Sequence, residues 1–346
     1  MPGFHPSGVA VVHGDTMKDF FIIDAPKFEN KNVDSYFVLS SIQQRERKQG
    51  GAYLALVLSD KTGSFDARMW EDFSDALATC GAGCYVKVRG QVSNYQGKFQ
   101  ITLQRMRMAA ESEIEPSDFL AVTTRDIEAM WAELRAHVAG FKNADLKRLV
   151  NAFLDDEEIA AAYKKAPAAK LLHHAWIGGL LEHVVGLLAV AKAVAPCYPE
   201  ADLDLIMTGC ILHDIGKTRE LAWKTSFRYT LEGLLIGHIS IAMGMLREKI
   251  EALGDFPDKL RILVEHMILS HHGQYEFGSP KLPMLPEAII FHTLDDLEAK
   301  LQAVRTEFAL QERNGSAADE MTERMWALDN RQILNTKRYL NDTEKK

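Results

Sequence analysis

The feature that most constrains this sequence is a change in hydrophobic period about a third of the way along the chain. Residues 33–108 contain runs in which apolar and polar residues alternate, as in half-buried strands, and Phe65–Trp70 is the clearest of them. From Arg125 onward the apolar residues recur with a period near 3.6, as they do in helices. A chain of 346 residues with such a change is expected to form two domains.

The N-terminal half predicts a small β-barrel. A short helix is expected at 71–80, and Asp60–Gly63 and Asn94–Gly97 are typical turns. Five strands with a helix after the third is the order of an OB-fold barrel, although the pattern alone also permits another small barrel. The expected strands lie near 34–39, 53–58, 65–70, 85–90 and 99–104.

The C-terminal half predicts a helical domain, and its first helix begins after Asp126, a plausible N-cap. Helices are expected near 126–140, 144–154, 156–164, 176–194, 202–214, 233–253, 257–272 and 285–308. The expected domains are an OB-fold barrel at 1–110, a linker at 111–125, a metal-binding helical domain at 126–312 and an extension at 313–346.

Composition limits the location of the protein. Four cysteines cannot form a dense disulfide framework, which favours a reducing cytoplasm. The N-terminus lacks the basic and apolar regions of a signal peptide. No membrane span is expected, because Glu182, His183 and Lys192 interrupt the most apolar stretch, Trp176–Ala195.

Charge is divided unevenly between the two halves. The formal net charge of −8 argues against a basic, non-specific nucleic-acid binder. Residues 1–110 hold 13 Lys and Arg against 11 Asp and Glu, so the N-terminal half is mildly basic and the remainder is acidic. An acidic total is therefore compatible with a nucleic-acid-binding barrel beside a cation site.

The histidines are concentrated in the helical half. Nine of the twelve lie between His173 and His292, where an even distribution would place about four. Clustered histidine with aspartate in a reducing compartment indicates a metal site, against the alternative of ordinary core and surface histidines. His5, His13, His137 and His173 are expected to be bystanders.

The pair His213-Asp214 is the centre of the predicted site. It follows ten mostly apolar residues, so its buried polar groups need partners from neighbouring helices. Five imidazoles and two carboxylates suit a site for two metal ions with room for water. The candidates are His183, His213, Asp214, His238, His271, His272 and Asp295.

These residues, in this order, resemble the H…HD…H…HH…D pattern of HD-domain phosphohydrolases. Surrounding segments such as Leu212–Lys217, Ile268–Gly273 and Glu276–Lys281 resemble one branch, the YhaM-type 3′–5′ exoribonucleases. The resemblance covers about 33–310. It implies an OB-fold nucleic-acid-binding domain before an all-α HD domain, and it makes the seven candidates the ligands of two divalent ions. Mn²⁺ fits the family best, with Fe²⁺, Mg²⁺ and Co²⁺ as alternatives.

Further roles follow from chemistry and from the resemblance. Asp214 has two carboxylate oxygens and is the best candidate to bridge two ions. Lys217 is a candidate to hold a phosphate oxygen, and the alternative is a solvated lysine. His174 matches a family histidine, which implies a role beside the ligands or with substrate. His266 should face away from His271 and is interpreted as structural.

Two further features are given roles by position alone. His292, three residues before Asp295, is expected to orient that carboxylate. Residues 276–283 are either a loop over the cleft or an ordinary connector.

The barrel predicts a binding surface for single strands. Leu54, Leu56 and Leu58 should face its core, and outward aromatic and basic residues suit base stacking and phosphate contacts. Tyr85 is expected to lie on the outward face of its strand. The candidates for nucleic-acid binding are Tyr53, Arg68, Trp70, Lys87 and Arg89.

The leading hypothesis is a metal-dependent exonuclease that removes nucleoside monophosphates from the 3′ end of single-stranded RNA, with single-stranded DNA as a further substrate class. The alternatives are a phosphohydrolase acting on nucleotides or cyclic dinucleotides, and a non-catalytic nucleic-acid-binding protein. A homo-oligomer is compatible with each. A cyclic-dinucleotide enzyme of the GYP branch would carry Gly-Tyr-Pro after its histidine pair, whereas Gly273-Gln274-Tyr275 follows His272.

Overall fold

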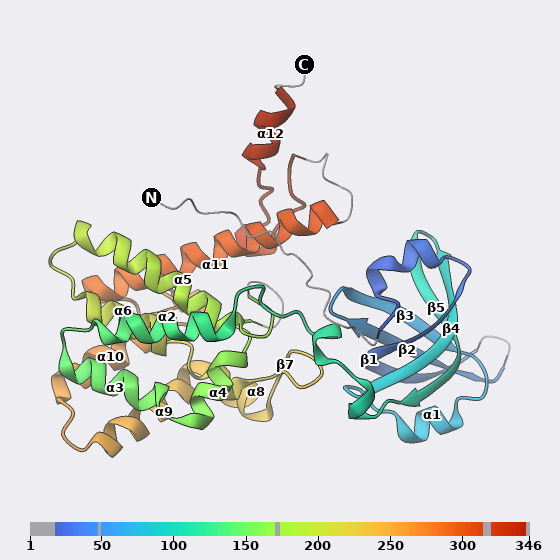
Figure 1. Cartoon of the computed structure of the whole chain (residues 1–346), viewed down its shortest axis with the longest axis horizontal. Coiled ribbons are helices and arrows are strands. Elements are labelled where there is room, and N and C mark those ends of the chain that lie inside the picture. Colours follow the sequence, from blue (N-terminus) through green and yellow to red (C-terminus); the bar gives the residue numbers. More distant parts are fainter. Residues whose placement is uncertain (1–17, 48–49, 170–173, 314–319, 344–346) are drawn as a thin grey trace. The chain divides into compact units, whose positions relative to one another are not determined.

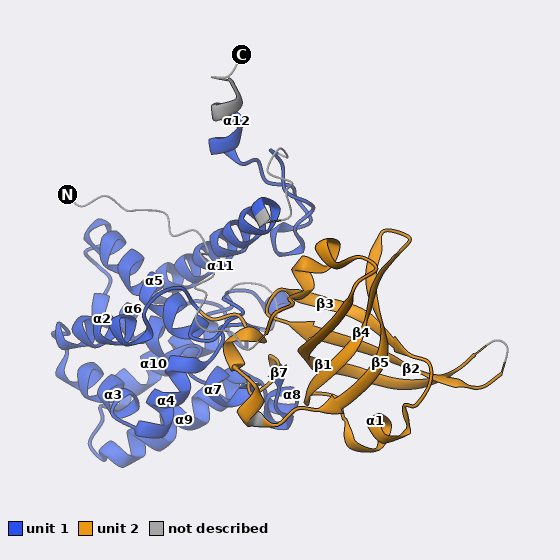
Figure 2. Ribbon diagram, turned by 45° about the vertical axis from the view of Figure 1, so that its right-hand side comes forward, with its two compact units in different colours: residues 1–11, 123–222, 228–346 blue, residues 12–122, 223–227 orange. Residues whose placement is uncertain are grey.

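The computed structural model describes residues 18–47, 50–169, 174–313 and 320–343. Contacts divide these residues into a barrel unit, 18–122 with 223–227, and a helical unit, 123–222 with 228–343 (Figures 1 and 2). His5, His13, His173 and most of the loop expected at 313–320 lie outside the described residues.

Five strands close the barrel in the order β1-β2-β3-β5-β4. β1 (Asn32–Glu46) pairs antiparallel with both β2 and β4, and a parallel pairing of β3 with β5 completes the ring. α1 (Ser74–Thr79) lies between β3 and β4 in the chain, so the predicted OB-fold order is confirmed. The other strands are β2 (Ala52–Asp60), β3 (Gly63–Met69), β4 (Tyr85–Tyr95) and β5 (Lys98–Met108).

Alternation along the strands fills the barrel. Leu54, Leu56 and Leu58 are buried as expected, while Tyr53 and Ala55 between them are partly exposed. The two-residue turn between β4 and β5 is formed by Gln96 and Gly97, both with positive φ, as a tight hairpin requires. The hydrophobic period therefore decides which face of each strand enters the core.

Residues 111–122, expected as a linker, pack on the barrel. Phe119 is buried against Tyr85, with ring centroids 4.8 Å apart, and Asp118 forms an ion pair with Lys61. Tyr85 does lie on the outward face of β4, but it is buried, contrary to the expectation of an exposed ring. The reason is a tertiary contact from a segment more than thirty residues away in the chain.

The helical unit confirms the expected helices, with small shifts at their ends. Asp126 caps α2 by accepting a hydrogen bond from the Ala129 amide. The principal helices are α2 (Ile127–Ala139), α3 (Ala144–Leu154), α4 (Glu157–Lys165), α5 (Gly179–Val194), α6 (Leu203–Leu212), α9 (His238–Leu253), α10 (Asp258–Ser270) and α11 (Pro286–Arg313).

The single helix expected at 233–253 is broken at Gly237. This glycine has φ 77° and separates α8 (Leu231–Ile236) from α9. A residue with a Cβ is disfavoured in this conformation, and the break makes His238 the first residue of a new helix. Its backbone amide is then free of intrahelical bonding and donates to Glu220.

Four short elements, besides the 3₁₀ turns, were not predicted. α7 (Lys217–Glu220) continues the chain after His213-Asp214, and β6 (Leu221–Ala222) pairs with β7 (Arg228–Tyr229). α12 (Thr336–Thr343) is tied to α11 by its own Arg338, which donates to the Phe308 carbonyl. None of these elements is long enough to show a clear hydrophobic period.

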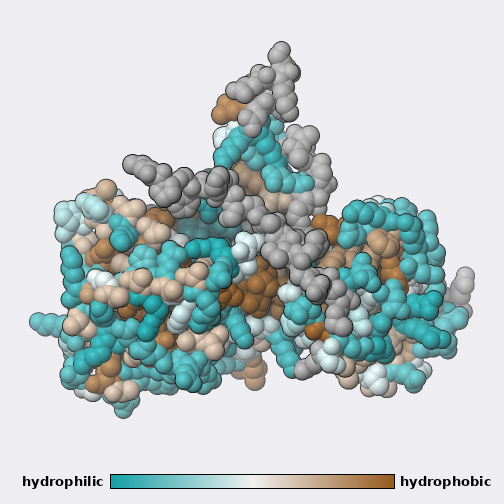
Figure 3. Space-filling view, viewed as in Figure 1, coloured by the Kyte–Doolittle hydropathy of each residue, from teal (hydrophilic) through white to brown (hydrophobic). Residues whose placement is uncertain are grey.

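One described segment, Gly179–Cys197, is long and apolar enough to cross a membrane by length and composition. It consists of α5 and the following turn, and Leu180, Val184, Leu187 and Leu188 of α5 are buried within the helical unit. The hydropathy of this segment is thus that of a core helix. Figure 3 shows that most of the visible surface is hydrophilic.

Candidate metal centre

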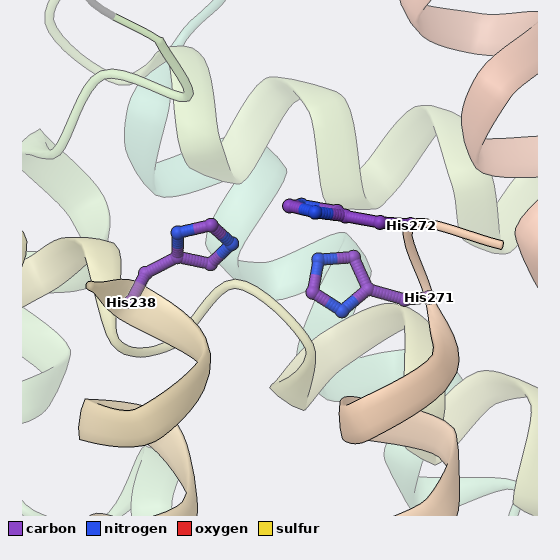
Figure 4. A group of neighbouring side chains, drawn as sticks. All are labelled: His238, His271 and His272. Atoms are coloured by element: carbon purple, nitrogen blue, oxygen red, sulfur yellow. The ribbon is translucent and has the colours of Figure 1, made fainter. Parts of the chain in front are cut away.

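The seven predicted ligands lie together in the helical unit. His183 is on the first turns of α5, Asp295 is on α11, and His238 begins α9. His213-Asp214 directly follows α6, and His271-His272 directly follows α10. In Figure 4 the rings of His238, His271 and His272 gather between the start of one helix and the end of another.

The ligand-type atoms form two neighbouring groups. His183, His213 and Asp295 form one, and His238, His271 and His272 form the other, each with its donor atoms within 4.8 Å of one another. The Nε2 atom of His183 lies 3.1 Å from Asp295 Oδ1, and the Nε2 atom of His213 lies 3.9 Å from the same oxygen.

Asp214 lies between the two groups. Its Oδ2 is 3.1 Å from His213 Nε2, in the first group. Its Oδ1 is 3.5 Å from His238 Nε2 and 3.9 Å from His271 Nε2, in the second group. Each oxygen of one carboxylate therefore faces a different group, which is the arrangement expected of a bridging ligand.

All five imidazoles use Nδ1 to bind the scaffold. The Nδ1 atoms of His213, His271 and His272 lie 2.7–3.0 Å from backbone carbonyls, which can only accept a hydrogen bond. When such a ring is neutral its proton is therefore on Nδ1, and the lone pair of Nε2 is available to a metal ion. His183 and His238 direct Nδ1 toward Glu298 and Glu220 at 2.6 and 3.1 Å.

Four buried atoms at the centre have no hydrogen-bond partner within the described part of the chain. They are the Nε2 atoms of His213, His238 and His271, and Oδ1 of Asp214. A buried acceptor without a partner costs about 1–3 kcal/mol. Four such acceptors, spread over the two groups around Asp214, fit bound cations, so the residues present fit a metal site.

The protonation states of Asp214 and His271 suit a bound cation. Burial favours a neutral carboxyl, but His213 and Lys217 outweigh it and hold the pKa of Asp214 well below its ordinary value. In His271, burial and the nearby His213 and His272 hold the pKa well below its ordinary value. Asp214 is thus ionised and His271 neutral, the forms in which both bind metals.

The pKa of His183 reflects the two carboxylates beside its ring, those of Asp295 and Glu298. Burial alone would lower its pKa, but hydrogen bonds to Asp295 and Glu298 raise it to about 10. Glu298, although buried, has its pKa lowered to about 2 by hydrogen bonds from His174 and His183. Two ionised carboxylates on opposite edges of one imidazole stabilise positive charge at its Nε2, whether from a proton or from a metal ion.

Glu298 and Glu220 were not among the predicted site residues. Glu298 follows Asp295 by three residues and so lies on the same face of α11, a spacing that would have indicated it. Its two oxygens contact His183 Nδ1 and His174 Nε2. Glu220 lies on the unpredicted α7, and no sequence signal marks it.

The remaining predicted site residues lie around the ligands. Lys217 donates to Asp214 Oδ2 over 2.7 Å, so it is not a freely solvated lysine. His174 is buried behind His183, with Glu298 between them, and its Nε2 lies 2.8 Å from Glu298 Oε1. That position suits a residue that orients a ligand, which is one of the two roles expected for it.

Two other histidines support the backbone. His292 directs Nδ1 to the His271 carbonyl, 2.9 Å away, and so supports the turn that carries two ligands. It was expected to orient Asp295, but that carboxylate lies beside His183 and His213. His266 accepts a hydrogen bond from the Met284 amide, in agreement with the structural role expected for it.

The five barrel candidates separate into two sets. Tyr53 stacks on Trp70, with ring centroids 4.7 Å apart, and Arg47 lies over the Trp70 ring. Arg68 and Tyr53 line a groove of about 180 Å³ over β1, β2 and β3. Trp70 directly follows β3 and does not belong to it.

Lys87 and Arg89 lie on β4, on the opposite side of β1. Lys87 forms an ion pair with Asp34 and lies over the ring of Tyr36, while Arg89 is exposed. The structure therefore brings Tyr53, Arg68 and Trp70 together and leaves the β4 cations as a second patch.

Comparison with known proteins agrees with this architecture. A family model for the HD domain matches residues 180–300, and one for an OB-fold nucleic acid binding domain matches residues 38–109. A 3′-5′ exoribonuclease YhaM of Geobacillus sp. (strain WCH70) is 37% identical over 302 residues, which are 87% of this chain and 91% of that protein. The YhaM of Bacillus subtilis (strain 168) is 37% identical over 302 residues, 87% of this chain and 94% of that protein.

The solved structure of a single-stranded DNA binding protein from Thermus aquaticus matches 23% of this chain over 40% of its own chain. It is 17% identical with a TM-score of 0.21, too low to carry an argument.

Proposed function

This chain belongs to the family of YhaM 3′–5′ exoribonucleases. We propose below which of its residues bind the metal ions, the phosphate and the RNA strand. It is a metal-dependent 3′–5′ exoribonuclease with an HD domain and an OB-fold domain. The observation that carries this function is the match to named relatives over 87% of the chain, which includes both domains.

We propose that His183, His213, Asp214, His238, His271, His272 and Asp295 hold two divalent ions, with Asp214 shared between them. Mn²⁺ is the expected metal, with Fe²⁺, Mg²⁺ or Co²⁺ as alternatives. Two such ions, when bound, activate a water and stabilise the attacking and leaving oxygens of a phosphodiester. The Nε2 atoms that face the centre and the carboxylate of Asp214 between the two groups support this assignment.

The chain's own side chains hold the reacting groups in place. Asp214 outweighs the effect of burial and raises the pKa of Lys217, so this ammonium stays charged beside the cluster. We propose that it attracts a non-bridging phosphate oxygen of the substrate while it orients Asp214. Hydrolysis adds one water across the terminal phosphodiester and releases a nucleoside monophosphate.

The groove of the barrel is proposed to hold the strand upstream of the cleaved end. Tyr53 and Trp70 offer aromatic faces for stacking, which is sequence-tolerant, and Arg68 offers charge for phosphates. Single-stranded RNA is the proposed substrate, with single-stranded DNA as a second class. Lys87 and Arg89 are proposed as phosphate contacts on the other side of β1. A cytoplasmic location and a homo-oligomer stay predictions.

The test uses the full chain with Mn²⁺ and single-stranded RNA labelled at the 5′ or the 3′ end. Successive shortening of 5′-labelled RNA, and immediate release of the 3′ label as mononucleotide, are expected. Asp214→Ala should abolish both. Turnover of free nucleotides or cyclic dinucleotides without cleavage of any polymer would contradict the proposal.

The barrel is tested with Trp70→Ala, which should raise KM for long RNA by about 5- to 150-fold, the range that one stacked base contributes. Hydrolysis of a small phosphodiester should be unchanged, because that substrate does not reach the barrel groove. Tyr95→Ala, at an exposed tyrosine of the β4–β5 turn, is the matched control. Equal effects of the two variants would refute the groove assignment.

A further inference from the structure

Two exposed aromatic rings follow directly after the ligand pair His271-His272. Tyr275 and Phe277 lie on a single 3₁₀ turn, Tyr275–Phe277, and each is 61% exposed. One exposed aromatic residue is ordinary on a protein surface, whereas here two lie within three residues, directly after a pair of candidate ligands. The residue between them, Glu276, is also exposed and carries negative charge.

This turn is attached firmly to the metal centre. The Phe277 carbonyl accepts a hydrogen bond from Nδ1 of His272 over 2.9 Å, and the Gln274 amide donates to the His272 carbonyl over 2.9 Å. Downstream, the buried Ser279 donates its hydroxyl to carbonyls of Leu269 and Lys281. The backbone that carries the two rings is therefore held at a set position relative to the imidazole of His272.

The chemistry of the turn selects one part of an RNA substrate. A phosphate is repelled by the Glu276 carboxylate and attracted to the cation site, whereas a nucleobase is neutral and flat. Every base has a π-face, so an aromatic surface without hydrogen-bonding pockets accepts all four. A terminal nucleotide whose phosphate lies at the ligand cluster carries its base one sugar away, within reach of a turn bonded to His272.

We propose that Tyr275 and Phe277 bind the base of the 3′-terminal nucleotide and so position the last phosphodiester at the metal centre. This inference rests on the proposed function and adds a positioning site to it. The site is distinct from the barrel groove: it binds the nucleotide that is removed, whereas the groove is proposed to bind the strand upstream of it. Cleavage without base preference is then expected, since stacking does not read the hydrogen-bonding edges of the bases.

The experiment compares two RNAs of equal length and charge, one normal and one whose 3′-terminal residue is an abasic ribose. Each is given to the wild type, to the double variant Tyr275→Ala/Phe277→Ala and to the control Tyr198→Ala. Tyr198 is an exposed tyrosine beyond the far end of α5, fifteen residues from His183. Both ring substitutions keep the backbone carbonyl that supports His272, and melting temperatures verify that the variants are folded.

For the wild type and the control, kcat/KM on normal RNA should exceed that on the abasic RNA by about 5- to 150-fold. The double variant should lose this advantage and cleave both RNAs at the rate the wild type shows on the abasic one. An unchanged ratio in the double variant would overturn the inference while RNA cleavage itself persists. Absence of RNA cleavage by the wild type would instead refute the proposed function, so the two failures are distinguishable.

Discussion

Gly273, the residue after the ligand pair, is a position at which even the smallest substitution should disturb the metal centre. An added Cβ would stand 2.0 Å from Cε1 and 2.1 Å from Nε2 of the His292 ring. Observed Cβ contacts essentially never fall below 3.0 Å, so the ring would have to move by about 1 Å. That movement breaks the hydrogen bond from His292 Nδ1 to the His271 carbonyl.

Gly278 supplies the matched control for Gly273→Ala. Both glycines have positive φ, 76° and 80°, but a Cβ at Gly278 meets nothing within 4 Å. Each substitution carries the left-handed penalty of about 1–2 kcal/mol. Only Gly273→Ala adds about 1–3 kcal/mol for overpacking and about 1 kcal/mol for the lost hydrogen bond. The expected difference between the variants is about 2–4 kcal/mol.

Unfolding of both variants in the presence of a chelator measures this difference without any contribution from bound metal. Titration calorimetry with Mn²⁺ should then show about 10- to 100-fold weaker binding to Gly273→Ala, the usual effect of disturbing a residue that orients a ligand. Adding His292→Ala removes the clash and should recover part of the stability. Equal losses for Gly273→Ala and Gly278→Ala, with equal metal affinity, would refute the reasoning.

Two further predictions concern buried charges. Glu298→Gln keeps the side-chain volume but weakens the hydrogen bond to His183, so Mn²⁺ affinity should fall about 10- to 100-fold. Excess Mn²⁺ should restore the maximal rate of RNA cleavage. A rate that no metal concentration restores would contradict a positioning role for Glu298. Burial lowers the pKa of Lys18 to about 8 despite the opposing effect of Asp60, from 10.5 in the unfolded chain. Between pH 8 and pH 10.5 the Lys18 amine therefore binds a proton in the unfolded chain but not in the folded one. The free energy of unfolding should rise by up to about 3 kcal/mol across this pH range. Lys18→Met should remove most of this slope in urea titrations; an identical slope would show that other groups cause it.

Local periodicity was sufficient for the architecture, because each strand and long helix buries one face in its own unit. The strand expected at 34–39 is in fact the first half of β1, whose second half, through Glu46, is polar and partly exposed and so lacks an apolar signal. The helix break at Gly237 was missed because the hydrophobic period continues across it. Tyr85 was assigned to the correct face, but a tertiary contact decides that it is covered.

The candidate site could be predicted as a set of ligands but not as a network. Histidine and aspartate types and their order, together with the resemblance to HD-domain phosphohydrolases, were sufficient to select the residues that converge. Their support depends on groups with no special sequence signature, such as the backbone carbonyls of Cys210 and Ile268 that accept from His213 and His271. Glu220 reaches His238 from a four-residue helix that no periodicity could reveal.

The double pairing of β1 has a consequence for synthesis on the ribosome. Its second half pairs with β2 through a local hairpin, but its first half waits for β4, and Asn32 finds its partner only at Gln91. At about 5–20 residues per second, translation leaves that edge unpaired for roughly 3–12 seconds. During this interval Val33 and Phe37, buried in the finished barrel, are open to other chains. The nascent N-terminal half is therefore expected to benefit from a chaperone until β4 has been synthesised.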